Sequence, residues 1–250
     1  MHQTLANATF QVVAGESRGS GFSFMHKAVV ITNFHVVKTL VDLEKKKTLG
    51  LVTLVTESGQ RLEAKILHAD PKNDFVIMQI TQQLPTGRVI LQPSQNFAPS
   101  RGLKLIFSGY PHGFPQLLTS EAIISSPLDE GKFAIDGMVN GGNSGGPIID
   151  RDSGEVVGIV TQRRYPMREE AEKFSEEISH LRSYLNHVKQ HGYVEVMGVD
   201  FGEMAEMFGR SLQVISEMMS LNANSGIGIG FPIQPVIDAI SLLNAQQAPH

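Results

Sequence analysis

The sequence contains no cysteine and no long hydrophobic run. The lack of cysteine excludes disulfide bonds and thiolate metal sites, and it permits a reducing compartment. No segment approaches the roughly 20 apolar residues of a membrane span, and the first residues lack the basic start and apolar run of a signal peptide. We therefore expect a cytoplasmic protein without a membrane span, or a periplasmic one if a leader has been removed.

Charged residues are also scarce, at 18% of the chain against roughly 25% in an average domain. Glycine is abundant by contrast, with 24 residues in a chain of 250, which suits many short strands joined by tight turns. This composition predicts an all-β core. The three consecutive lysines at residues 45–47 are too few for a nucleic-acid patch, so we expect no nucleic-acid partner.

The most informative motif is the Gly-Asn-Ser-Gly-Gly-Pro run at residues 142–147. A serine nucleophile needs a tight turn whose backbone N–H groups point at a developing oxyanion, and neighbouring side chains would obstruct that approach. Ser144 is therefore the candidate nucleophile. The N–H groups of Gly142 and Ser144 are the candidate oxyanion donors.

Serine needs a histidine to take its proton and a carboxylate to orient that histidine. The apolar run at residues 29–37 reads as a buried strand ending near His35, the candidate base. Residues 70–80 read as a turn that opens into an apolar strand, with Asp74 at the start of that strand. Asp74 is the candidate orienting carboxylate.

The serine motif also fits the G-x-S-x-G elbow of α/β-hydrolases, which is the main alternative. That fold needs a strand and a helix around the serine and the chain order Ser, Asp, His. Here the order is His, Asp, Ser, and the flanks of Ser144 read as strand and turn. The histidines after Ser144 lie in a helical-looking segment or at the C-terminus. The elbow is disfavoured.

Several blocks in order along the chain resemble the chymotrypsin-fold serine proteases, specifically the HtrA/Deg branch of trypsin-like peptidases. The resemblance covers residues 8–165 and 225–245. Its blocks are residues 19–22, 32–37, 70–76, 109–111 with 119–125, 136–147, 157–161 and 228–233. It implies a mainly β fold, a chymotrypsin-like double β-barrel formed by residues 1–165 and 225–250, with a C-terminal helix at Pro235–Leu243. No PDZ-like segment follows.

The resemblance implies a serine endopeptidase that works through an acyl-enzyme without a metal or organic cofactor. His35 would be general base and acid, Asp74 its orienting group, Ser144 the nucleophile, and Gly142 with Ser144 the oxyanion hole. Digestive trypsins carry aspartate at the position of Asn143, where it pairs with a newly cut N-terminus. An amide cannot form that ion pair, so we expect activation by loop ordering and not by zymogen cleavage.

The resemblance also indicates the pocket for the substrate residue before the scissile bond (P1). Its lining would be Met138, Val139, Asn140, Thr161, Gln162 and Arg163. Met138 takes the pocket-base position, where a trypsin-type pocket needs a carboxylate. We therefore expect a preference for small or apolar residues and not for Arg or Lys. Arg163 could narrow the pocket, hold an acidic group or belong to a solvated loop.

Residues 166–224 form an insertion with apolar residues at helical spacing in both halves, which predicts a helical hairpin. The insertion holds 10 acidic and 5 basic residues, a net charge of −5. It could be a lid, a docking arm for a regulatory partner or a homo-oligomer contact, or its apolar stripe could pack internally. His187 and His191, four residues apart, could bind a metal, but the sequence places no acidic or thiolate residue in evident register with them, so we expect no metal site.

A function of another class remains open at this point. A protease fold could recognise exposed apolar peptide without cutting it, as a catalytically silent or chaperone-like module. The combination of His35, Asp74 and Ser144 favours the enzyme, whose partner would be a protein or peptide substrate.

Overall fold

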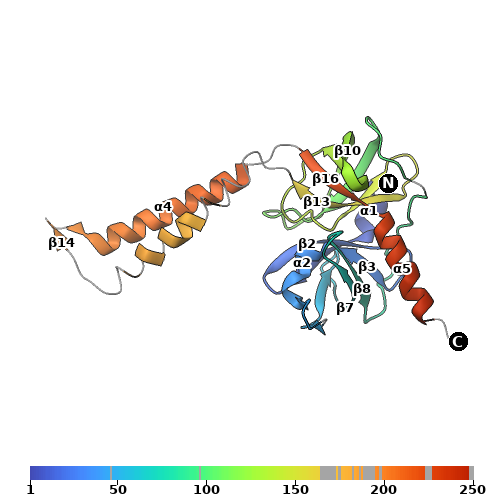
Figure 1. The fold of residues 1–250 in the computed structure, drawn as a ribbon, viewed down its shortest axis with the longest axis horizontal. Coiled ribbons are helices and arrows are strands. Elements are labelled where there is room, and N and C mark those ends of the chain that lie inside the picture. The colour runs from blue at the N-terminus through green and yellow to red at the C-terminus, as the bar shows by residue number, and fades with distance from the viewer. Residues whose placement is uncertain are drawn as a thin grey trace. The chain divides into compact units, whose positions relative to one another are not determined.

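The chain divides into two compact units in a computed structural model: residues 1–163 with 226–250, and residues 164–225 (Figure 1). The structure describes residues 1–45, 47–95, 97–163, 173, 176–181, 183–185, 187, 195–196, 199–222 and 227–247. Each unit is described by itself below.

The first barrel of the larger unit is closed, with strand order β1-β2-β3-β8-β7-β6. Its strands are β1 (Thr9–Ala14), β2 (Ser17–Ser23), β3 (Val29–Thr32), β6 (Val52–Val55), β7 (Arg61–Asp70) and β8 (Phe75–Ile80). Buried residues alternate with half-buried ones along β6 and with exposed ones at the start of β7, as expected for strands with one face toward a core. Phe10, Val12, Leu54 and Met78 belong to that core.

The second barrel is also closed, with strand order β10-β11-β16-β13-β12-β9. Its strands are β9 (Lys104–Gly109), β10 (Leu118–Pro127), β11 (Phe133–Asp136), β12 (Pro147–Asp150), β13 (Val156–Arg163) and β16 (Ile227–Pro232). Leu105, Phe107, Phe133 and Ile135 lie in its core. Strand β16 pairs with both β11 and β13, so residues on either side of the smaller unit close one barrel.

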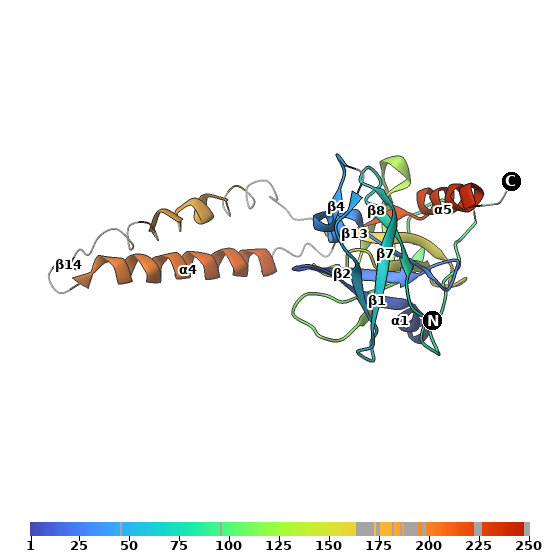
Figure 2. The ribbon, with the colours of Figure 1, turned by 90° about the horizontal axis from the view of Figure 1, so that it is seen from below.

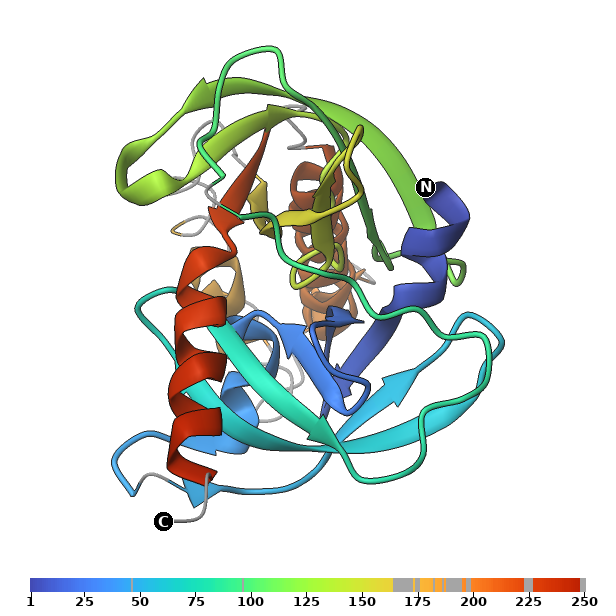
Figure 3. The ribbon, with the colours of Figure 1, turned by 90° about the vertical axis from the view of Figure 1, so that its right-hand side faces the viewer.

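A third apolar cluster lies where the two barrels meet and contains side chains from both, including Phe22 and Ile31 from the first and Ile106 and Ile159 from the second. Helix α1 (His2–Ala8) adds Leu5 and Ala8, and helix α5 (Gln234–Gln247) adds Val236 and Ile240. Figure 3 shows α5 following β16 of the second barrel and running along the side of the first barrel. This shared core fixes the barrels relative to each other and so positions any site built from both.

Two local predictions differ from the structure. The predicted strand at residues 29–37 ends at Thr32, and a one-turn helix α2 (Phe34–Val37) follows, which buries Val36 and Val37 in the first barrel. The side chain of Thr32 donates a hydrogen bond to the carbonyl of Ser20 at 2.6 Å, which fixes the end of the strand. The predicted C-terminal helix is correct in place but runs longer than Pro235–Leu243.

Short elements complete the larger unit. They are the 3-10 helices Lys38–Leu40 and Asp129–Gly131 and the paired strands β4 (Val41–Asp42) and β5 (Lys47–Thr48).

The smaller unit contains the long helix α4 (Phe201–Asn222), which matches the second predicted helix. Residues 176–181 and 183–185 are helical as well and run alongside α4 in two perpendicular views (Figures 1 and 2). Residues 173 and 187 are helical too, whereas the other residues of the first predicted helix, and His191, lie outside the described residues. Strands β14 (Glu195–Val196) and β15 (Val199–Asp200) pair with each other. None of the helices in the described part of the chain is long and apolar enough to cross a membrane.

Candidate active site

His35 and Asp74 form a hydrogen-bonded pair on the first barrel. His35 lies in α2, and Asp74 directly precedes β8. The Asp74 Oδ2 atom lies 2.8 Å from Nδ1 of His35, and Oδ1 accepts the His35 backbone N–H at 3.0 Å. Because a carboxylate can only accept, Nδ1 carries the proton in this contact and Nε2 remains the basic nitrogen. The two contacts fix both the tautomer and the orientation of the ring.

Asn33 links this pair to the second barrel. Its fully buried side-chain Nδ2 donates to the backbone carbonyl of Asp74 at 2.7 Å and to Oγ1 of Thr161 at 3.0 Å. Asp74 has a positive φ of 49°, a conformation that costs about 1 kcal/mol and that aspartate tolerates better than most residues. The bond from Asn33 helps to hold Asp74 in that conformation.

Ser144 lies in the loop of residues 137–146 between β11 and β12, which we call the serine loop. Its Oγ donates a hydrogen bond to the carbonyl of Thr161 at 3.0 Å. Within the described part of the chain, no hydrogen bond joins Ser144 to His35. Thr161 thus bonds to both Ser144 and Asn33, and Asn33 in turn bonds to Asp74 of the His35–Asp74 pair. All three predicted residues belong to one polar network, and the Ser144 hydroxyl would have to leave Thr161 to reach His35.

Two carbonyl groups of the serine loop accept hydrogen bonds, one from a residue outside the loop and one from within it. The N–H of His112 donates to the Gly141 carbonyl at 2.7 Å, and the N–H of Gly146 donates to that of Asn143 at 2.9 Å. In a planar trans peptide, the N–H of the next residue points in the direction opposite to the carbonyl. The N–H groups of Gly142 and Ser144, which follow these two carbonyls, have no acceptor among the described residues. The loop therefore offers unpaired donors on either side of Asn143.

Glycine is required at two positions in this loop. Gly142 and Gly145 have φ values of 93° and 87°, which other residues rarely adopt. A Cβ atom at Gly142 would also collide with the carbonyl oxygen of Tyr110, and one at Gly145 with that of Ser20. The glycine-rich sequence follows from the close approach of the loop to both barrels.

Asn143 stabilises the turn of the loop. Its Oδ1 accepts the N–H of Asn140 at 3.0 Å, and its own N–H donates to the Asn140 carbonyl at 3.1 Å. The side chain is almost fully buried. A neutral amide thus holds this turn through contacts within the loop.

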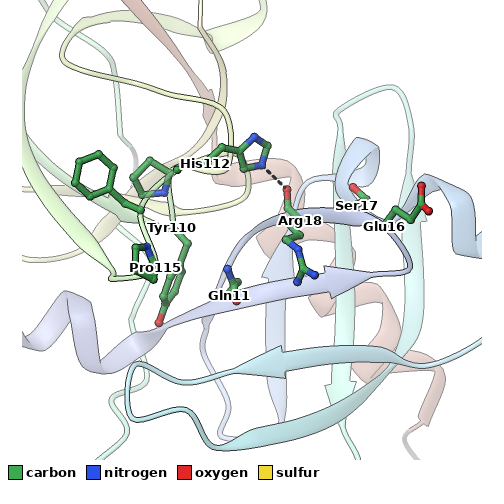
Figure 4. A pocket seen from close by; sticks show the side chains of 10 residues that line it. Gln11, Glu16, Ser17, Arg18, Tyr110, His112 and Pro115 are labelled. Carbon is green, nitrogen blue, oxygen red and sulfur yellow. Dashed lines mark hydrogen bonds between the residues drawn. The ribbon is translucent and has the colours of Figure 1, made fainter. Parts of the chain in front are cut away.

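A cavity of about 620 Å³ lies beside the serine loop (Figure 4). Glu16 from the turn between β1 and β2 and Ser17 and Arg18 from the start of β2 line one side, and Tyr110 and His112 from the segment after β9 line the other. The His112 Nε2 lies 3.3 Å from the carbonyl oxygen of Arg18, as the dashed line in Figure 4 marks. Because the His112 backbone holds Gly141, the wall of this cavity is continuous with the serine loop.

Tyr110 is buried, and among the described residues its hydroxyl has no hydrogen-bond partner. Burial raises its pKa to about 12, because the phenolate would lose its hydration. Burial also lowers the pKa of nearby Arg88 to about 10. The Arg88 guanidinium lies 3.9 Å from the centre of the Phe10 ring and donates to the Thr9 carbonyl at 2.7 Å.

The residues predicted to line the P1 pocket differ in their surroundings. The Met138 side chain is 65% exposed, whereas Val139 is buried in the core of the second barrel. Thr161 is buried beneath Ser144 in the polar network, and Gln162 and Arg163 pair through their backbones with β16. Their assignment to a substrate pocket, together with Asn140, stays a prediction.

Sequence reasoning missed three residues that hold the candidate site together. Asn33 stood out only as a polar residue in an apolar run, and Ser20 only as part of the Gly-Ser-Gly-Phe block at residues 19–22. Nothing in the sequence drew attention to His112. Each acts through contacts with segments far away along the chain.

Comparisons with known proteins identify the family and the fold. Residues 19–159 match the family model described as a trypsin-like peptidase domain. The chain is 32% identical over 152 residues to a probable periplasmic serine endoprotease DegP-like of Brucella suis, covering 58% of this chain and 27% of that protein. It is 30% identical over 158 residues to the chloroplastic Protease Do-like 5 of Arabidopsis thaliana, covering 58% and 48%.

A solved serine endoprotease from Yersinia pestis shares the fold, with a TM-score of 0.54 and 22% identity over 65% of this chain and 56% of that one. The matched part of the chain spans from about a quarter to half of the length of the two curated relatives, from Brucella suis and Arabidopsis thaliana. The family match covers more than half of the chain, and the two closed barrels are those of a chymotrypsin-like fold. The chain belongs to the family of trypsin-like peptidases and is related to the HtrA/Deg proteases.

Proposed function

We propose that this protein is a serine endopeptidase in which Ser144 is the nucleophile, His35 the general base and Asp74 its orienting group. The observation that carries the proposal is the serine loop, whose unpaired Gly142 and Ser144 N–H groups lie on either side of Asn143. It is supported by the 2.8 Å contact between Asp74 and Nδ1 of His35, which leaves Nε2 basic. Loop and pair together supply a nucleophile, a base and an anion site.

In the first step the Ser144 hydroxyl turns from Thr161 toward His35, and its oxygen attacks the carbonyl carbon of the scissile peptide. Nε2 of His35 takes the proton, and Asp74 stabilises the resulting imidazolium. The former carbonyl oxygen becomes an anion that accepts hydrogen bonds from Gly142 and Ser144. Since the loop carbonyls are already bonded, these donors need little reorganisation.

The intermediate then collapses. His35 returns its proton to the leaving amine, the C–N bond breaks, and an ester remains on Ser144. A water molecule attacks this ester while His35 takes one of its protons. The ester bond breaks, the new carboxylic acid leaves, and Ser144 regains a proton from His35. No metal or organic cofactor enters these steps.

The cavity beside the serine loop is proposed to receive the part of the peptide that leaves as the amine. Its position next to Gly141 and His112 supports this role. On the acyl side, we propose that Met138 through Asn140 and Thr161 through Arg163 contact the P1 residue. The absence of a carboxylate among these residues supports cleavage after small or apolar residues and not after Arg or Lys.

A second candidate function is peptide binding without cleavage. It is favoured by one observation, the hydrogen bond of the Ser144 hydroxyl to Thr161 in place of His35. In that case the barrels would hold exposed apolar peptide and release it intact. The endopeptidase is preferred because Thr161 and Asn33 join Ser144 to the His35–Asp74 pair in one polar network, and catalytic hydrogen bonds often tighten only when substrate binds.

The smaller unit is proposed to mediate contact with a second copy of the chain or with a regulatory protein. Helix α4 supports this role, because large apolar side chains on one of its faces are 43% to 66% exposed. They are Met204, Met207, Phe208, Val214 and Ile215. Flexible methionines suit an adaptable protein contact. A cytoplasmic location, or a periplasmic one if a leader has been removed, is also proposed; one matched relative is named a probable periplasmic serine endoprotease.

Labelling with a fluorophosphonate probe tests the proposed chemistry, with Ser144→Ala as the control. The enzyme predicts labelling of the wild type that the substitution abolishes. Cleavage of a mixed peptide library then tests specificity, and dominant cleavage after Arg or Lys would reject the apolar pocket. Peptide binding with neither labelling nor cleavage would favour the binding module.

A further inference from the structure

Ser20, in β2 of the first barrel, contacts the serine loop through both its hydroxyl and its backbone N–H. Its fully buried Oγ donates to the Gly142 carbonyl at 2.7 Å and accepts the N–H of Tyr110 at 2.9 Å. Its backbone N–H donates to the Ser144 carbonyl at 2.8 Å. One residue of the first barrel therefore holds carbonyls on both sides of Asn143 in a loop of the second.

From these contacts we propose that Ser20 is a positioning residue for the oxyanion hole, an inference that rests on the proposed endopeptidase function. His112 and Gly146 orient the peptides that carry the Gly142 and Ser144 N–H groups. Ser20 fixes the peptides that follow Gly142 and Ser144. With all four peptides held, the unpaired donors keep their directions when the substrate anion forms.

The hydroxyl of Ser20 both donates and accepts a hydrogen bond in this arrangement. Its single proton goes to Gly142, and a lone pair receives Tyr110, so the segment after β9 and the serine loop are tied to the same atom. Space around it is limited, since a Cβ atom at Gly109 would lie 2.8 Å from the Ser20 oxygen. Removal of the hydroxyl leaves the Gly142 carbonyl without its donor and frees the following peptide to rotate.

The substitution Ser20→Ala tests this role, with Ser23→Ala as the matched control. Ser23 lies on the same strand and is also fully buried, but its hydroxyl has no hydrogen-bond partner among the described residues. We expect Ser20→Ala to lower kcat by about 10- to 100-fold with KM little changed, because oxyanion contacts strengthen in the transition state. Ser23→Ala should keep the wild-type kcat.

The rate must be expressed per active site, from titration with the fluorophosphonate probe. A purely structural role for Ser20 would lower the melting temperature or the fraction of titratable sites and leave kcat per site unchanged, and that outcome would overturn the proposal. If the alanine variant does not fold, Ser20→Cys keeps a donor at this position, but a weaker one, and should give a kcat below that of the wild type. A wild-type kcat per site in that variant would also overturn the proposal.

The two proposals fail in different ways. If the wild type itself neither labels nor cleaves, the endopeptidase function is wrong and the role of Ser20 fails with it. If the wild type labels and cleaves while Ser20→Ala matches it, only the role of Ser20 is wrong.

Discussion

The serine loop and helix α4 differ in how far their groups are paired or buried within the fold. In the serine loop the carbonyls from Gly141 to Ser144 are bonded, and the glycine positions leave no room for side chains. In α4, by contrast, several large apolar side chains are exposed. Met207 and Phe208 are 66% and 55% exposed.

This difference indicates that the larger unit holds a fixed geometry for chemistry, whereas the smaller unit presents a surface for association. Backbone groups whose hydrogen bonds are all made within the fold are held in a single geometry. A catalytic site needs such a fixed geometry. Exposed apolar side chains gain stability only when something covers them. We therefore expect changes in the serine loop to alter the rate of each site, and changes in α4 to alter association.

The largest effect is expected for Asp74→Asn. The amide retains the size of the side chain but cannot stabilise the imidazolium, and it can favour the wrong tautomer of His35, so kcat should fall by about 10⁴-fold. Steady-state hydrolysis of an activated ester measures the change. The exposed Asp136, which precedes the serine loop, provides the control Asp136→Asn. A retained rate in the Asp74 variant would break the assignment of the pair.

Gly142→Ala should lower kcat by about 10²- to 10³-fold, the range expected when one oxyanion donor is lost. The new Cβ cannot be accommodated beside the Tyr110 carbonyl, so the loop must move. Gly87→Ala is the matched control, because Gly87 also has a positive φ, of 83°, but open space around it. Equal losses of kcat in both variants would mean that backbone strain, and not the oxyanion site, causes the effect.

Phe208→Glu should leave kcat on a small ester unchanged and weaken self-association or partner binding by at least about tenfold. The reason is that a charge placed on an apolar contact must be desolvated. Light scattering and sedimentation over a range of concentrations measure self-association. Leu242→Glu on α5, at 65% exposure, is the control for an exposed apolar residue elsewhere. A fall in kcat without a change in mass would instead make the smaller unit a lid.

Tyr110→Phe should have the smallest effect, a gain of about 1 kcal/mol in the free energy of unfolding, because it removes a buried hydroxyl without a partner. Burial raises the pKa of Tyr110 to about 12, above its ordinary value near 10. The neutral phenol is thus favoured by folding, and this contribution is complete below pH 10 and is lost as the pH rises to 12.

Urea unfolding of both proteins at pH 8 and pH 11 measures this difference. The wild type should lose more stability than the phenylalanine variant between these values, because Arg88 titrates in both proteins and only the phenol is removed. Identical losses in the two proteins would show that the Tyr110 hydroxyl is not desolvated.

Much of the fold was predictable because its signals are local. Abundant glycine and turn residues indicate a β core, the resemblance to trypsin-like peptidases implies the two barrels, and the block around Ser144 needs only neighbouring glycines to be recognised. The one-turn helix carrying His35 was mistaken for strand, because Val36 and Val37 are buried in either case. Contacts such as Ser20 with Gly142 and Asn33 with Thr161 join segments more than 100 residues apart, and no local pattern encodes them.

The most direct test of the central claim is rapid-quench mass spectrometry of the protein mixed with an activated peptide ester. The endopeptidase predicts an acyl adduct on the peptide that contains Ser144, formed in a burst, absent in Ser144→Ala and lost again by hydrolysis. The account is contradicted if the ester or a peptide binds measurably but no adduct forms on Ser144, or if the adduct persists unchanged in the alanine variant.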